Sequence, residues 1–92
     1  MMSGKKRVLF RSEEKKDRQS VADFLHQFAD KIAEGEVVLL QGTEETRIAI
    51  PEIVEFEIKA TKKTKKGNRV KRDLEIELDW YEGEQEKPVK LG

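Results

Sequence analysis

Two stretches of the chain, residues 53–63 and 69–80, alternate apolar and charged side chains with a period of two. Successive side chains of a β-strand point to opposite faces, so this alternation predicts two long strands, each with one apolar and one charged face. Apart from Ile53, the apolar residues stand at even-numbered positions: Val54, Phe56, Ile58 and Ala60 in the first stretch, and Val70, Leu74, Ile76, Leu78 and Trp80 in the second. The pattern is typical of a half-buried antiparallel hairpin.

The parity of these positions restricts the loop between the two strands. Residues directly opposite each other in an antiparallel pair share a face, so the numbers of paired residues must sum to an even number. A two-residue turn of Gly67 and Asn68 is excluded by this rule. A three-residue loop that ends at Gly67 pairs Phe56 with Ile76, and one that ends at Asn68 pairs Phe56 with Leu78. The first is slightly favoured because glycine adopts the left-handed conformation more readily, while the second matches more apolar pairs.

An amphipathic helix is predicted over residues 18–34. Its apolar residues recur at helical spacing and share one narrow face: Val21, Phe24, Leu25, Phe28 and Ile32. Asp17 is the expected N-cap, with Ser20 as a later alternative, and Gly35 stands where a left-handed C-cap residue belongs.

Three shorter strands complete the expected secondary structure, at residues 6–13, 37–41 and 46–50. The last is stopped by Pro51, which cannot donate a hydrogen bond to a strand ladder.

The order β-α-β-β-β-β predicts an α+β protein with two layers. One mainly antiparallel sheet would carry the helix on one face, with Trp80 closing the sheet against the helix. We expect a single domain over residues 1–92, because a chain of this length has room for one core. Its ordered part would run from about residue 6 to 81, and residues 82–92 would form a flexible tail.

The formal net charge is zero, but the charges are segregated along the chain. Residues 1–16 carry +4, residues 17–58 carry −7, residues 59–72 carry +8 and residues 73–92 carry −5. Such a distribution bears on binding partners rather than on fold. The periodic apolar positions argue against disorder, although 41% of the residues are charged.

The residue inventory argues against an enzyme. There is no cysteine, and the single histidine, His26, falls on the polar side of the helix. No glycine-rich phosphate loop is present, so no cofactor is expected. The longest apolar run, Val37 to Leu40, is too short for a membrane span. The sequence predicts a cytoplasmic protein that does not associate with membranes.

The strongest functional candidate is the loop between the two long strands. Eight basic residues lie there with no acidic residue among them: Lys59, Lys62, Lys63, Lys65, Lys66, Arg69, Lys71 and Arg72. A basic ribbon can follow a phosphate backbone or contact an acidic protein, and lysine at a hairpin end also blunts sheet edges. No aromatic side chain is interleaved to stack on bases.

Two other surfaces bear on possible binding. The acidic residues on the charged face of the long strands are expected to splay outward, which does not suit a metal site. Exposed apolar residues, including Leu9, Ile53 and Tyr81, could support self-association.

The sequence also resembles a known family in three places. These are Arg11-Ser12-Glu13-Glu14, the helix end Ala33-Glu34-Gly35, and the stretch from Leu74 to Trp80. In this order and spacing they resemble the amphi-Trp domain, found in small bacterial and archaeal proteins, over roughly residues 8–81. The resemblance implies no known activity, because the role of that family is uncharacterised.

Taken together, these features predict a small non-enzymatic binding or adaptor module. Its partner would be an unknown protein, and the chain itself would be a monomer or a weak homodimer. The alternative is weak, nonspecific binding of nucleic acid through the basic residues between 59 and 72.

Overall fold

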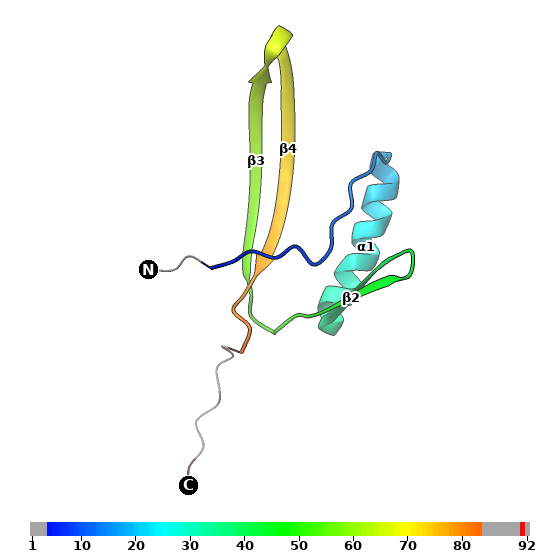
Figure 1. The fold of residues 1–92 in the computed structure, drawn as a ribbon, viewed down its shortest axis with the longest axis vertical. Coiled ribbons are helices and arrows are strands. Elements are labelled where there is room, and N and C mark those ends of the chain that lie inside the picture. The colour runs from blue at the N-terminus through cyan, green and yellow to red at the C-terminus, as the bar shows by residue number, and fades with distance from the viewer. Residues whose placement is uncertain (1–3, 84–90, 92) are drawn as a thin grey trace. The chain divides into compact units, whose positions relative to one another are not determined.

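The computed structural model describes residues 4–83 and 91. The chain divides into two compact units, Met1–Ile50 and Pro51–Gly92, and each is described here by itself (Figure 1). The first contains helix α1 and strands β1 and β2, and the second contains strands β3 and β4.

Helix α1 spans Arg18–Glu34, as the apolar periodicity predicts. Its N-cap is Asp17, whose carboxylate accepts a hydrogen bond of 3.0 Å from the backbone N–H of Ser20. Ser20 therefore lies inside the helix, and the alternative start there is wrong. Gly35 ends the helix in the left-handed conformation, with φ of 89°, and its N–H donates to the carbonyl groups of Lys31 and Ile32.

Strands β1, Glu36–Gln41, and β2, Glu44–Ala49, form an antiparallel hairpin in which Val37 lies opposite Ile48. The two residues between them, Gly42 and Thr43, form a tight turn in which Gly42 has a φ of 59°. Beyond the ladder, the N–H of Ile50 donates to the carbonyl of Gly35 over 2.8 Å. This hydrogen bond joins the end of the helix to the end of the hairpin. Both predicted short strands after the helix are confirmed.

The packed interior of this first unit is small. Val37 on β1 is only 4% exposed and is the buried residue among those described. On α1, Phe28 and Ile32 are half-buried, whereas Phe24 is 51% exposed. The predicted apolar stripe of the helix therefore exists, but the first unit covers only part of it.

The predicted first strand over residues 6–13 is wrong, because these residues form no strand in the structure. Val8 and Leu9 are exposed, and only Phe10 is partly covered. A strand is stabilised by the hydrogen bonds of a neighbouring strand, and this segment pairs with none. The loose alternation of apolar and polar residues over so few positions cannot replace these missing hydrogen bonds.

In the second unit, β3, Glu55–Lys65, pairs antiparallel with β4, Arg69–Asp79, through the short 3₁₀ turn η1, Lys66–Asn68. Phe56 lies opposite Leu78, so the parity rule and the three-residue loop are confirmed.

The slightly favoured register, with Phe56 opposite Ile76, is wrong. Both Gly67 and Asn68 have positive φ, 72° and 59°, and asparagine tolerates this conformation better than most residues. The loop can therefore end at Asn68. The resulting ladder pairs Ile58 with Ile76, and the added apolar pairing favours it.

The α+β class and the antiparallel pairing of strands are confirmed. The four strands, however, form two separate two-stranded sheets rather than one sheet. The packing of the helix on a sheet face and the single domain stay predictions. Of the predicted flexible tail, residues 84–90 and 92 lie outside the described part of the chain. No helix in that part is long and apolar enough to cross a membrane.

The buried position of Val37 can be tested by truncation. Val37→Ala should lower the free energy of unfolding by about 2 kcal/mol, because it removes buried methyl groups and leaves a cavity. Leu40→Ala, on the same strand but 71% exposed, is the matched control and should cost well under 1 kcal/mol. Urea denaturation measures both. Equal losses would contradict the placement of Val37 in the core.

The cap of α1 makes the stability of the helix dependent on pH. Hydrogen bonds from the side chain and the backbone N–H of Ser20 lower the pKa of the Asp17 carboxyl below its ordinary value of 3.8. Because its pKa is lower in the folded protein, the Asp17 carboxylate stabilises the folded state at pH values above the pKa that it has in the unfolded chain. This contribution is lost as the pH falls through the folded-state pKa.

Asp17→Asn keeps a capping side chain but removes the titrating group. Amide exchange at Ser20 and Val21 should therefore lose protection on acidification in the wild type and change less in the variant. Identical pH profiles would show that the carboxylate does not cap the helix.

Candidate functional site

The eight basic residues predicted as a site all lie at one end of the β3–β4 hairpin, and all are exposed. We call this end the basic tip: Lys59, Lys62, Lys63 and Lys65 on β3, Lys66 in η1, and Arg69, Lys71 and Arg72 on β4. The structure therefore places at one end of the hairpin the eight basic residues that the sequence analysis proposed as a site.

The register of the hairpin places like charges directly opposite each other in the basic tip. Three of its cross-strand pairs are basic on both sides: Lys62 with Arg72, Lys63 with Lys71, and Lys65 with Arg69. Like charges in this position repel and destabilise the ladder. Because side-chain direction alternates, the first pair lies on the even-numbered face and the other two lie on the odd-numbered face. Positive charge is thus presented on both faces of the ribbon.

Within the described residues, no side chain of the basic tip forms an ion pair with a carboxylate. All ion pairs there lie in the first unit, among them Arg47 with Glu36 at 3.0 Å and with Glu45 at 2.7 Å. Lys59 has Glu75 as its cross-strand neighbour but makes no ion pair with it within 4.0 Å. Among the described residues, the basic tip is therefore a positive surface without ion pairs.

The opposite end of the hairpin is acidic. We call it the acidic base, and it carries eight carboxylates and no basic residue between positions 51–58 and 73–83: Glu52, Glu55, Glu57, Asp73, Glu75, Glu77, Asp79 and Glu82. At the border with the basic tip, the hydroxyl of Thr61 donates to the carboxylate of Asp73, its cross-strand neighbour. Among the described residues, no three Asp, Glu or His side chains gather closely enough to hold a metal ion.

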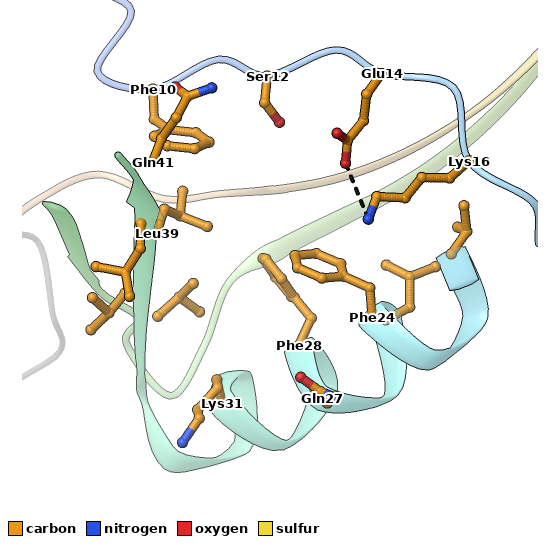
Figure 2. A pocket seen from close by; sticks show the side chains of 15 residues that line it. Phe10, Ser12, Glu14, Lys16, Phe24, Gln27, Phe28, Lys31, Leu39 and Gln41 are labelled. Atoms are coloured by element: carbon orange, nitrogen blue, oxygen red, sulfur yellow. Dashed lines mark ion pairs between the residues drawn. The ribbon is translucent and has the colours of Figure 1, made fainter. Parts of the chain in front are cut away.

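A second feature, which the sequence analysis did not identify, is an apolar cleft of about 630 Å³ in the first unit (Figure 2). Phe24 and Phe28 of α1 line it, with ring centroids 5.9 Å apart, and residues of β1 line it from the other side. Phe10 and an ion pair of 3.1 Å between Glu14 and Lys16 lie along the N-terminal segment at its edge. The cleft offers apolar contact area. The sequence feature that could have indicated this cleft is the apolar Phe10, which stands shortly before the helix.

The remaining candidates are placed as follows. His26 is exposed on α1, and Trp80 is half-buried directly after β4. Leu9, Ile53 and Tyr81 are exposed, at 65%, 78% and 78%. Their role in self-association stays a prediction.

Comparison with known proteins agrees with the resemblance read from the sequence. The model of the Amphi-Trp domain matches residues 3–92. The chain belongs to the Amphi-Trp domain family. Neither the curated proteins nor the solved structures that were compared with this Amphi-Trp domain include a match. Its function must therefore be argued from its own residues.

The repulsion within the basic tip can be tested by converting one like-charge pair. Lys63→Glu, opposite Lys71, should stabilise the hairpin of this Amphi-Trp domain by about 0.5 kcal/mol, because opposite charges across a ladder attract. Lys63→Gln, which removes the charge without reversing it, is the control. Amide exchange of β3 and β4 at low salt measures the difference, which should shrink at about 0.5 M salt. Lower protection with glutamate than with glutamine would refute this account.

Proposed function

We propose that this protein is a non-enzymatic binding module that engages an anionic partner through the basic tip of its β3–β4 hairpin. The observation that carries the proposal is the set of three cross-strand pairs that are basic on both sides. Such pairs weaken the hairpin that contains them. An anion between or beside the paired side chains would convert this repulsion into attraction.

The shape of the basic tip supports an extended, highly charged partner. Basic side chains stand on both faces of a two-stranded ribbon, and the strand ladder holds their spacing along the ribbon. A ribbon of this kind fits the major groove of duplex DNA, which is about 12 Å wide, or can run along a phosphate backbone. An acidic protein surface is the other partner that these charges suit.

Of the two candidate partners, nucleic acid allows the more detailed prediction. The composition of the basic tip restricts how it would be bound. No aromatic side chain occurs from Lys59 to Arg72, so the bases have no stacking partner. Contacts would be made to phosphates, without sequence preference, with a dissociation constant of about 10⁻⁴–10⁻⁶ M at physiological salt. We extend the proposal to a cytoplasmic location, where nucleic acids and acidic proteins are both present.

Fluorescence anisotropy tests the proposal with a labelled duplex, a labelled single strand and a labelled polyglutamate peptide at low salt. The wild type should bind the duplex with a log–log salt slope near −3 to −4, which corresponds to about three or four phosphate contacts. Replacing Lys62, Lys63, Lys65 and Lys66 together with serine should abolish binding and leave the far-UV circular dichroism unchanged, because all four are exposed.

The matched control removes the same amount of positive charge elsewhere. Lys5, Lys6, Arg7 and Lys15 are also exposed, and their replacement with serine should leave duplex binding nearly unchanged. Binding of polyglutamate but not of nucleic acid would favour an acidic protein partner. If neither polymer bound, or if both variants lost binding equally, the basic tip would not be a specific binding surface.

A further inference from the structure

The odd-numbered face of the basic tip carries two consecutive pairs that are basic on both sides. Lys65 lies opposite Arg69, and Lys63 lies opposite Lys71, two residues further along the ladder. All four side chains are exposed. Opposite residues of a ladder are about 5 Å apart at Cβ, and residues i and i+2 of one strand are about 7 Å apart. The four side chains therefore start from the corners of a rectangle of about 5 by 7 Å. We call these four residues the basic quartet.

The even-numbered face of the basic tip offers no such block of charge. It has one basic pair in the ladder, and both neighbouring pairs on that face are uncharged. The basic pair is Lys62 with Arg72, and its neighbours are Thr64 with Val70 and Ala60 with Leu74. In the ladder, the basic tip thus presents two cations on its even-numbered face and four adjacent cations at the end of its odd-numbered face.

Acidic residues limit the basic quartet on the side of the acidic base. The next pair on the odd-numbered face is Thr61 with Asp73, and the hydroxyl of Thr61 donates to the Asp73 carboxylate. Further along, Glu57 lies opposite Glu77, six residues or about 20 Å from the nearer pair of the quartet. An anionic chain that ran along this face would leave the quartet within about 7 Å and then meet carboxylates. A chain that crosses the ribbon avoids them.

We infer that the basic quartet binds one phosphodiester backbone of a nucleic acid, which crosses the odd-numbered face of the hairpin. This inference rests on the proposed function and names the part of the partner that the basic tip would contact. Successive phosphates of one strand lie about 3.4 Å apart along the axis of duplex DNA, so a single backbone offers several closely spaced charges to the quartet. Each phosphate among the four cations replaces a repulsion across the ladder by an attraction.

One face of the ribbon contacts one backbone, which distinguishes this arrangement from insertion of the hairpin into a groove. A hairpin inside the major groove would contact both strands of a duplex and would use both of its faces. The quartet instead suits a single strand and a duplex alike. With four phosphate contacts, the log–log salt slope should be about −3.6 on duplex DNA and about −2.8 on a single strand.

Fluorescence anisotropy with a labelled duplex and a labelled single strand, from about 50 to 200 mM salt, tests the inference. Lys63→Gln with Lys71→Gln removes one pair of the quartet. This variant should bind the duplex roughly tenfold more weakly or worse, and the magnitude of its salt slope should fall by about 1.8. Lys62→Gln with Arg72→Gln is the matched control, because it lies one residue away on the even-numbered face and also removes two charges and one like-charge pair. Its salt slope should equal that of the wild type.

Two further variants test the extent of the site. Lys65→Gln with Arg69→Gln removes the other pair of the quartet, and it loses one lysine and one arginine, as the even-face control does. It should weaken binding as strongly as the first quartet variant. Glu57→Gln with Glu77→Gln should leave the affinity unchanged at about 0.15 M salt, because the pair lies well beyond the Debye length of about 8 Å.

The outcomes separate this inference from the proposed function. Equal losses of affinity and slope in the quartet and even-face variants would overturn the inference and leave the proposed function standing. Binding of the duplex without binding of the single strand would overturn it in favour of groove insertion. A gain in affinity in the glutamate variant would show that the backbone runs along the ribbon instead of crossing it. If the wild type bound polyglutamate but neither nucleic acid, the inference would fail and an acidic protein partner would remain. A wild type that bound no polyanion would refute both.

Discussion

The hydrogen-bonded ladder between β3 and β4 is the constraint on which the second unit depends. Side chains alternate along each strand, so a pairing that sums to an even number places every apolar residue on one face. A slip by one residue would set Phe56 against a charged neighbour and move the apolar set of one strand to the wrong side. The observed pairing of Phe56 with Leu78 also determines which charges meet, because it aligns Lys62 with Arg72 and Lys63 with Lys71.

The ladder divides the hairpin both across and along its length. Across the ribbon, the even-numbered face is mainly apolar and the odd-numbered face is mainly charged. Along the ribbon, the acidic base gives way to the basic tip near the hydrogen-bonded pair of Thr61 and Asp73. Charge of one sign at each end is unfavourable within a single hairpin. The same distribution leaves positive groups on both faces of the basic tip, where the proposed anionic partner can reach them.

The first unit depends on local signals more than on burial. The carboxylate of Asp17 and the left-handed Gly35 determine where α1 begins and ends, and both lie within one turn of the residues that they cap. The packed interior of this unit is small, since Val37 is the buried residue among those described. The apolar stripe of α1 instead lines a cleft with β1 and with Phe10.

The sequence by itself determined the extent of α1, its caps, the apolar face of the long hairpin and the eight residues of the basic tip, because these follow from periodicity, capping chemistry and composition. Only the tertiary structure decided three other features: the pairing of Phe56 with Leu78 rather than Ile76, the lack of a strand at residues 6–13, and the division of four strands between two sheets. Each of these depends on which backbone groups find partners far away in the chain. Parity allowed both hairpin registers, and the alternation around Val8 and Phe10 is compatible with a strand only where a neighbouring strand is present to bond with it.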